Sequence, residues 1–140
     1  MHELILFFLK HWVLSLGFIT VLICVVVNEC IVLKTSPKKL APTQLVEMIN
    51  HSTPLLLDLR EALLYKKSHI IQSVVFLNTE DDRKKLLLQK DQVIVLICAT
   101  GNHALIVAKQ LRSHGMSNIY ILHGGISAWR EAGLPIIKNT

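Results

Sequence analysis

The 140-residue chain has few cysteines, and their positions exclude a disulfide framework. Only three are present, and two of them, Cys24 and Cys30, lie in or beside an apolar N-terminal stretch. Cys98 therefore has no partner in the rest of the chain. A small secreted domain of this size would be expected to carry paired cysteines. A single free thiol instead fits a reducing compartment.

Aromatic residues are also scarce, and no basic stripe is interleaved with them. Aromatics make up 6% of the chain, and its formal net charge of +5 is spread along the sequence. Nucleic-acid-binding proteins concentrate positive charge in a patch or stripe, so we expect no nucleic-acid partner. His114 and His123 lack cysteine or carboxylate neighbours at metal-ligand spacing, so we expect no metal site either.

Hydrophobic residues are abundant, at 51% of the chain, and the N-terminal part contains an uncharged run over residues 12–27. Apolar residues continue past Asn28-Glu29 to residue 33, which approaches the roughly 20 residues of a spanning helix. We predict a membrane anchor over residues 1–33, with the transmembrane helix at about 12–32. A cleaved signal peptide is the alternative, but no small-x-small cleavage site follows Val27.

Basic residues beside the anchor predict its orientation. Lys34, Lys38 and Lys39 follow it, whereas only Lys10 and the amino terminus precede its uncharged run. Positively charged flanks stay in the cytoplasm, so the C-terminal part is expected there. Residues 34–38 form a predicted linker, in which Ser36-Pro37 disfavours helix. Residues 39–140 then form one domain.

Within this domain, apolar stretches suited to strands alternate with helical patterns. This alternation predicts an α/β fold, with a central parallel sheet of five strands and helices on both faces. The expected strands begin near residue 39 and cover 55–59, about 73–76, 93–98 and 118–122. The expected helices cover about 43–50, with Pro42 or Thr43 first, then 61–67, a stretch from 80 onward, 104–111 and 127–132.

Cys98 ends the most strongly apolar strand, at the point where a helix follows almost at once. Residues 93–98 are all apolar, and the apolar residues of 104–111 have helical spacing. Between them Gly101 can adopt a positive φ. We call residues 98–103 the cysteine loop. Its amides and the following helix N-terminus are expected to face the sulfur and favour the thiolate. A buried core cysteine is the alternative.

Four short motifs, in order over about residues 38–138, resemble the rhodanese homology domain. Besides the strand ending in Cys98 with Gly101 after it, they are Asp58-Leu59-Arg60, Ser68-His69-Ile70, and Gly124-Gly125 with Trp129 and Gly133-Leu134-Pro135. With its apolar N-terminus, the chain is similar to membrane-tethered single-domain rhodaneses of the bacterial YibN type. This resemblance implies a rhodanese-like fold and a single-pass protein of the inner (cytoplasmic) membrane.

The resemblance also implies sulfur transfer without a metal or organic cofactor. In the family, the cysteine attacks the sulfane sulfur of thiosulfate or of a persulfide, and an acceptor then removes this sulfur. Cys98 is the implied nucleophile, and Asp58 and Arg60 either support the site or form a buried structural pair. The implied partners are a small-molecule sulfur donor or a persulfide-carrying protein, membrane lipid around the helix, and a membrane protein. The implied persulfide- and substrate-binding residues are Ala99, Thr100, Gly101, Asn102 and His103.

Two departures from the family pattern affect the expected substrate. Catalytic members often carry arginine where this chain has Ala99 and His103. Without a guanidinium to grip a sulfonate, we expect weak use of thiosulfate. A rhodanese-fold module that tethers partners at the membrane with little turnover is therefore the alternative. A phosphatase or arsenate reductase is disfavoured, because Ala104 occupies the position where those enzymes need arginine.

Overall fold

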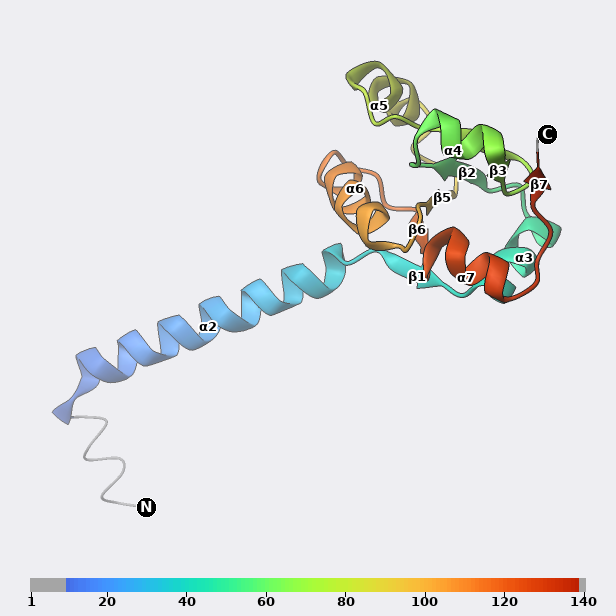
Figure 1. Cartoon of the computed structure of the whole chain (residues 1–140). Coiled ribbons are helices and arrows are strands. Elements are labelled where there is room, and N and C mark those ends of the chain that lie inside the picture. Colours follow the sequence, from blue (N-terminus) through green and yellow to red (C-terminus); the bar gives the residue numbers. More distant parts are fainter. Residues whose placement is uncertain (1–9, 139–140) are drawn as a thin grey trace. The chain divides into compact units, whose positions relative to one another are not determined.

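The computed structural model describes residues 10–138, which form an apolar helix and a separate α/β domain (Figure 1). The chain divides between Ser36 and Pro37. Helix α2, Trp12–Thr35, covers the predicted transmembrane segment and ends directly before Ser36-Pro37. Its part Trp12–Ile31, 20 residues, is long and apolar enough to cross a membrane. At 1.5 Å per residue this part is about 30 Å long, the thickness of the hydrocarbon core.

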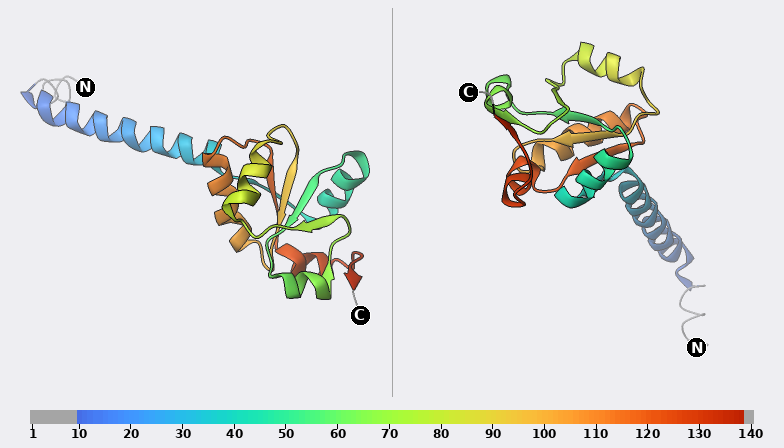
Figure 2. Two further views of the ribbon diagram at one scale, coloured as in Figure 1. Left: turned by 90° about the horizontal axis from the view of Figure 1, so that it is seen from above. Right: turned by 90° about the vertical axis from the view of Figure 1, so that its right-hand side faces the viewer.

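The domain is built on a parallel sheet of five strands in the order β1-β6-β5-β2-β4, which confirms the predicted sheet. Buried β5 lies in its centre and pairs with β2 on one side and β6 on the other. Because all five strands run the same way, their carboxyl ends share one edge of the sheet (Figure 2). The strands are β1 Lys38–Leu40, β2 Leu55–Asp58, β4 Ser73–Val75, β5 Ile94–Ile97 and β6 Ile119–Leu122.

Helices cover both faces of the sheet, as predicted. The larger core cluster joins Ile94 and Leu96 of β5 to α5 and α6, and the other joins Val95 and Ile97 to α3 and α7. This alternation follows from the period of two along a strand. It places the Cys98 side chain in the cluster of α5 and α6. The helices are α3 Pro42–His51, α4 Ala62–Lys67, α5 Glu80–Leu87, α6 Asn102–Ser113 and α7 Gly125–Glu131.

Local chemistry explains where two of these helices begin. The Thr79 hydroxyl accepts a hydrogen bond from the Asp82 amide at 3.2 Å, which caps α5. Helix α3 starts at Pro42, the first of the two predicted starts. Its cap is Ala41, whose amide donates to the Gln44 side chain at 2.9 Å. Proline suits this first helical position, because an amide there has no intrahelical hydrogen-bond partner and its absence therefore loses no hydrogen bond.

Two features differ from the sequence prediction. A second sheet, in which β3, Ser68–His69, pairs antiparallel with β7, Ile137–Lys138, was not expected. Two-residue strands are too short to show a period of two, so the sequence carries no signal for them. Helix α7 begins at Gly125, two residues before the predicted start at Ser127. Glycines are poor helix formers, and the contacts that hold Gly125 there are tertiary.

Candidate active site

Cys98 follows β5 directly, at the carboxyl edge of the sheet, and is buried with 3% of its surface exposed. The Gly101 amide donates a hydrogen bond to its sulfur over 2.9 Å. At least one loop amide therefore faces the sulfur, as the sequence predicted.

Gly101 turns the chain from the cysteine loop into α6. Its φ of +95° lies in the left-handed region, which a residue with a side chain rarely adopts. A Cβ here would also lie 3.4 Å from the Gly124 amide nitrogen and from the Leu122 carbonyl oxygen. These distances are ordinary van der Waals contacts, so the positive φ, and not a lack of space, favours glycine at this position.

The start of α7 holds the backbone of the cysteine loop from the other side. The Ile126 amide donates to the Cys98 carbonyl at 2.9 Å. The Ser127 amide and hydroxyl both donate to the Ala99 carbonyl, at 3.3 and 3.1 Å. Three donors thus fix two consecutive carbonyls of the cysteine loop.

Gly125 makes this docking sterically feasible. A Cβ at Gly125 would lie 2.3 Å from the Cys98 carbonyl oxygen and 2.6 Å from the Ala99 carbonyl carbon. Gly124 and Gly125 have positive φ values of 71° and 61°. The sequence identified the glycine pair only as a family motif, and its contact with Cys98 appears only in three dimensions. The adjacent glycines before a helix were the available signal.

The rest of the cysteine loop is open to solvent and carries no permanent cation. Ala99, Thr100, Asn102 and His103 are exposed. No hydrogen bond links His103 to Cys98 in the described part of the chain. The loop therefore offers backbone amides and small polar side chains to a ligand, without the guanidinium that would clamp a sulfonate.

Asp58 and Arg60 form a buried ion pair at the end of β2. The Arg60 Nη2–Asp58 Oδ2 distance is 2.7 Å, and the Arg60 Nε donates to Asp58 Oδ1 at 3.0 Å. Arg60 Nη2 also donates to the Ser68 carbonyl at 2.7 Å, which ties β2 to β3. The neighbouring Leu57 packs in the same cluster as Cys98, so alternation directs Asp58 to the opposite face of the sheet. The structure thus places this pair on the face of the sheet opposite the Cys98 side chain, where it ties β2 to β3.

The Ser68-His69 motif joins the small sheet to two helices. Arg130 of α7 donates a hydrogen bond to the Ser68 hydroxyl. The His69 ring stacks on Tyr65 of α4, with centroids 4.1 Å apart, and its Nδ1 lies 3.0 Å from the Tyr65 carbonyl. The sequence did not single out Arg130 or Tyr65.

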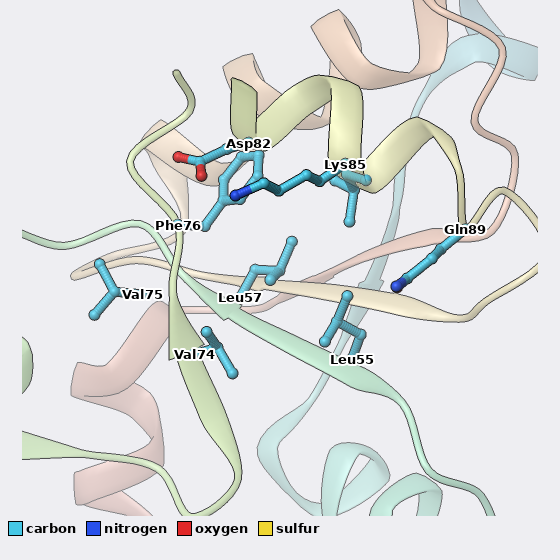
Figure 3. Close-up of a pocket in the computed structure, with 9 residues that line it drawn as sticks. Leu55, Leu57, Val74, Val75, Phe76, Asp82, Lys85 and Gln89 are labelled. Carbon is cyan, nitrogen blue, oxygen red and sulfur yellow. The ribbon is translucent and has the colours of Figure 1, made fainter. Parts of the chain in front are cut away.

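An apolar groove of about 230 Å³ lies away from the cysteine, between α5 and the strands β2 and β4 (Figure 3). Leu57 and Phe76 form part of its floor, and Lys85 projects over it. None of its lining residues belongs to the cysteine loop. Among the described residues no cluster of three histidine, cysteine or acidic side chains could hold a metal ion. The candidate site is therefore the cysteine loop itself.

Comparison with known families agrees with this geometry. The model of the Rhodanese-like domain matches residues 41–132. The chain belongs to the rhodanese family. A rhodanese-related protein of Thermoplasma volcanium has a crystal structure that aligns with a TM-score of 0.60 at 29% identity, covering 71% of this chain and 97% of that one.

Two relatives differ in how much of the chain they match. The uncharacterized protein YibN of Escherichia coli (strain K12) is 25% identical over 142 residues, 99% of either chain. The thiosulfate sulfurtransferase GlpE of Shewanella oneidensis is 30% identical over 99 residues, covering 70% of this chain and 97% of GlpE. The match to YibN therefore includes the apolar helix, whereas the match to GlpE is limited to about the domain.

Proposed function

We propose that this rhodanese is a membrane-anchored sulfurtransferase that carries sulfane sulfur as a persulfide on Cys98. The observation that carries the proposal is the 2.9 Å hydrogen bond from the Gly101 amide to the Cys98 sulfur. The same donor can hold the inner sulfur of a persulfide anion. Family membership supports sulfur transfer as the class of reaction.

The proposed reaction has two displacement steps. In the first, the Cys98 thiolate attacks the outer sulfur of the donor. A sulfur–sulfur bond forms to Cys98, and the donor's own sulfur–sulfur bond breaks, releasing sulfite from thiosulfate or a thiolate from a persulfide. In the second step a thiolate or cyanide attacks the outer sulfur of the Cys98 persulfide. The Cys98 thiolate leaves, so no net oxidation occurs and no cofactor is required.

The exposed cysteine loop favours a persulfide as donor over thiosulfate. Ala99 and His103 provide no permanent positive charge for a sulfonate group. A persulfide on a small thiol or on a protein needs no such clamp, because its leaving group is a single thiolate. The proposed partners are therefore a persulfide donor and a thiol acceptor.

Helix α2 is proposed to anchor the domain in the inner membrane, with the domain in the cytoplasm. Its polar side chains suit a lipid environment, since Thr20 donates to the Leu16 carbonyl at 2.8 Å and Ser15 to the His11 carbonyl at 3.2 Å. These bonds leave neither hydroxyl unsatisfied in hydrocarbon. The basic residues Lys34, Lys38 and Lys39 support the cytoplasmic side.

A tethering module is the second candidate function. The lack of arginine in the cysteine loop favours it, because binding of a partner protein requires no grip on a small anion. In this case the membrane helix would hold a partner at the bilayer, and Cys98 would not turn over.

Turnover by the full-length chain in detergent separates the two candidates. We expect the protein to accelerate the formation of thiocyanate from cyanide and a glutathione persulfide, and we expect Cys98→Ser to lower the rate to that of the uncatalysed reaction. A Cys24→Ala/Cys30→Ala variant is the matched control and should retain the activity. If no donor supports turnover while a partner protein co-purifies with both wild type and Cys98→Ser, the sulfurtransferase is rejected in favour of the module.

A further inference from the structure

The sheet edge opposite Cys98 is rich in basic residues. In a parallel sheet the amino ends of the strands share one edge, and the connections that enter them lie there. Here this edge comprises the start of β1, the last turns of α5 and α6, and the connections 52–54, 88–93 and 114–118, which lead into β2, β5 and β6. We call it the basic edge. Its basic residues are Lys38, Lys39, Lys84, Lys85, Lys90 and Arg112.

Hydrogen bonds show that these connections lie side by side. The Leu55 amide donates to the Val93 carbonyl at 2.8 Å, and the Ile94 amide donates to the Asn118 carbonyl at 2.9 Å. A Cβ at Gly115 would lie 3.9 Å from the Lys90 ammonium nitrogen. The three connections therefore form one continuous stretch of the basic edge.

Positive charge dominates this surface because the helices end there. Lys84 and Lys85 occupy the last turn of α5, and Arg112 the last turn of α6. Basic residues are favoured at helix carboxyl ends. Asp91 is the only acidic residue in the three connections. The acidic first turn of α5, Glu80-Asp81-Asp82, follows β4 and so lies toward the cysteine edge.

An exposed leucine projects from the basic edge. Leu88 follows α5 directly and is 87% exposed, more than any other large hydrophobic residue of the domain. Lys85 and Lys90 flank it in the sequence. Ile71, 48% exposed, lies in the turn before β4, at the same end of the sheet. Apolar side chains surrounded by lysines are typical of segments that lie at a membrane interface.

We propose that the basic edge docks on the anionic surface of the membrane that holds α2. The proposal rests on the proposed anchoring by α2, and it adds a lipid-binding surface in the domain. Charge complementarity favours this partner, because each lysine near an anionic leaflet strengthens attraction about fivefold. The short connection also favours docking, since only Ser36 and Pro37 separate α2 from Lys38.

Docking in this way determines where Cys98 is presented. Cys98 lies at the carboxyl end of β5, and the basic edge lies at the amino end. The four residues of β5 span about 13 Å. A docked domain therefore turns its cysteine loop away from the bilayer, toward sulfur donors and acceptors in the aqueous phase.

Hydrogen exchange of the full-length chain in lipid nanodiscs tests the docking. We expect amides of residues 84–92 to exchange at least about threefold more slowly with roughly 30% phosphatidylglycerol than in pure phosphatidylcholine. Salt at about 0.5 M should remove the difference, because it screens exposed charges. Lys84→Glu/Lys85→Glu should also remove it, and Leu88→Ser should reduce it.

A second lysine pair provides the matched control. Lys66 and Lys67 occupy the last turn of α4, as Lys84 and Lys85 do in α5, so Lys66→Glu/Lys67→Glu makes the same charge change outside the basic edge. We expect it to retain the lipid-dependent protection. Equal exchange in both lipids, with the chain present in both nanodiscs, would overturn the docking but not the anchor. Absence of the chain from both nanodiscs would overturn the anchor and the docking together.

Discussion

Gly125 is the single residue on which the geometry of the cysteine loop depends most. It lets the amide of Ile126 and both donors of Ser127 reach the carbonyls of Cys98 and Ala99. Gly133 provides a natural comparison, because it also has a positive φ but has open space around its Cα. Alanine substitutions at the two glycines can therefore separate two free-energy costs, that of a side chain at a left-handed backbone position and that of displacing the cysteine loop.

Gly125→Ala should therefore be much more damaging than Gly133→Ala. The added methyl group would lie 2.3 Å from the Cys98 carbonyl oxygen, so the loop or α7 must move. We expect a loss of at least about 3 kcal/mol in the free energy of unfolding, combining left-handed strain with overpacking. Gly133→Ala should cost about 1–2 kcal/mol. Urea unfolding of both variants measures the difference, and equal costs would contradict the docking of α7 on the loop.

Asp58 should contribute to stability more than to catalysis. It is fully buried and paired with Arg60, so Asp58→Ala leaves an uncompensated buried guanidinium. We expect a loss of about 3–5 kcal/mol in the free energy of unfolding. The double variant Asp58→Ala/Arg60→Met should lose less than Asp58→Ala alone, because it removes the unpaired charge.

Unfolding curves and sulfur loading test both roles of this pair. A double variant that folds but no longer takes up sulfur on Cys98 would contradict a purely structural role of the Asp58–Arg60 pair.

At the scale of elements, the cysteine loop determines which donor is used. We predict that Ala99→Arg/His103→Arg raises kcat/KM for thiosulfate by about 10- to 100-fold, the effect of one or two charge-assisted hydrogen bonds. Activity with a glutathione persulfide should change much less, because this donor lacks a sulfonate. Steady-state assays with both donors measure the ratio. A similar gain with both donors would contradict the account of the loop.

The sequence predicted those elements whose signals are local. Strand β5 and helix α6 have strong apolar patterns over residues 93–98 and 104–111, and Thr79 is a common type of helix cap. The start of α7 at Gly125 was not predictable in this way, because it depends on hydrogen bonds to carbonyls 28 residues earlier in the chain than their donors. The two-residue strands β3 and β7 depend on tertiary pairing for the same reason.

In the candidate site, too, the residues could be predicted from the sequence but their contacts could not. Cys98, Gly101 and the missing arginines were evident from sequence order alone. That Gly101 donates to the sulfur, and that Asp58 and Arg60 form a framework pair, required coordinates. Spacing along the chain could not determine on which face of the sheet the Asp58 side chain lies relative to Cys98.

At the scale of the whole molecule, the proposed topology places the domain in the cytoplasm. Expressed in a bacterium with a C-terminal tag, the full-length chain should keep this tag when protease is added to intact spheroplasts. The tag should be lost when the spheroplasts are lysed, because the inner membrane then no longer shields it. Cleavage of the tag in intact spheroplasts would contradict the orientation that Lys34, Lys38 and Lys39 predict.

The central claim is that Cys98 carries sulfur, and intact-mass spectrometry of the full-length chain tests it most directly. After incubation with a persulfide donor, we expect a gain of one sulfur atom that cyanide or a thiol removes. Cys98→Ser should show no gain, whereas Cys24→Ala/Cys30→Ala should gain sulfur like the wild type. The absence of added sulfur on the folded wild type with every donor, or an equal gain on Cys98→Ser, would contradict the account.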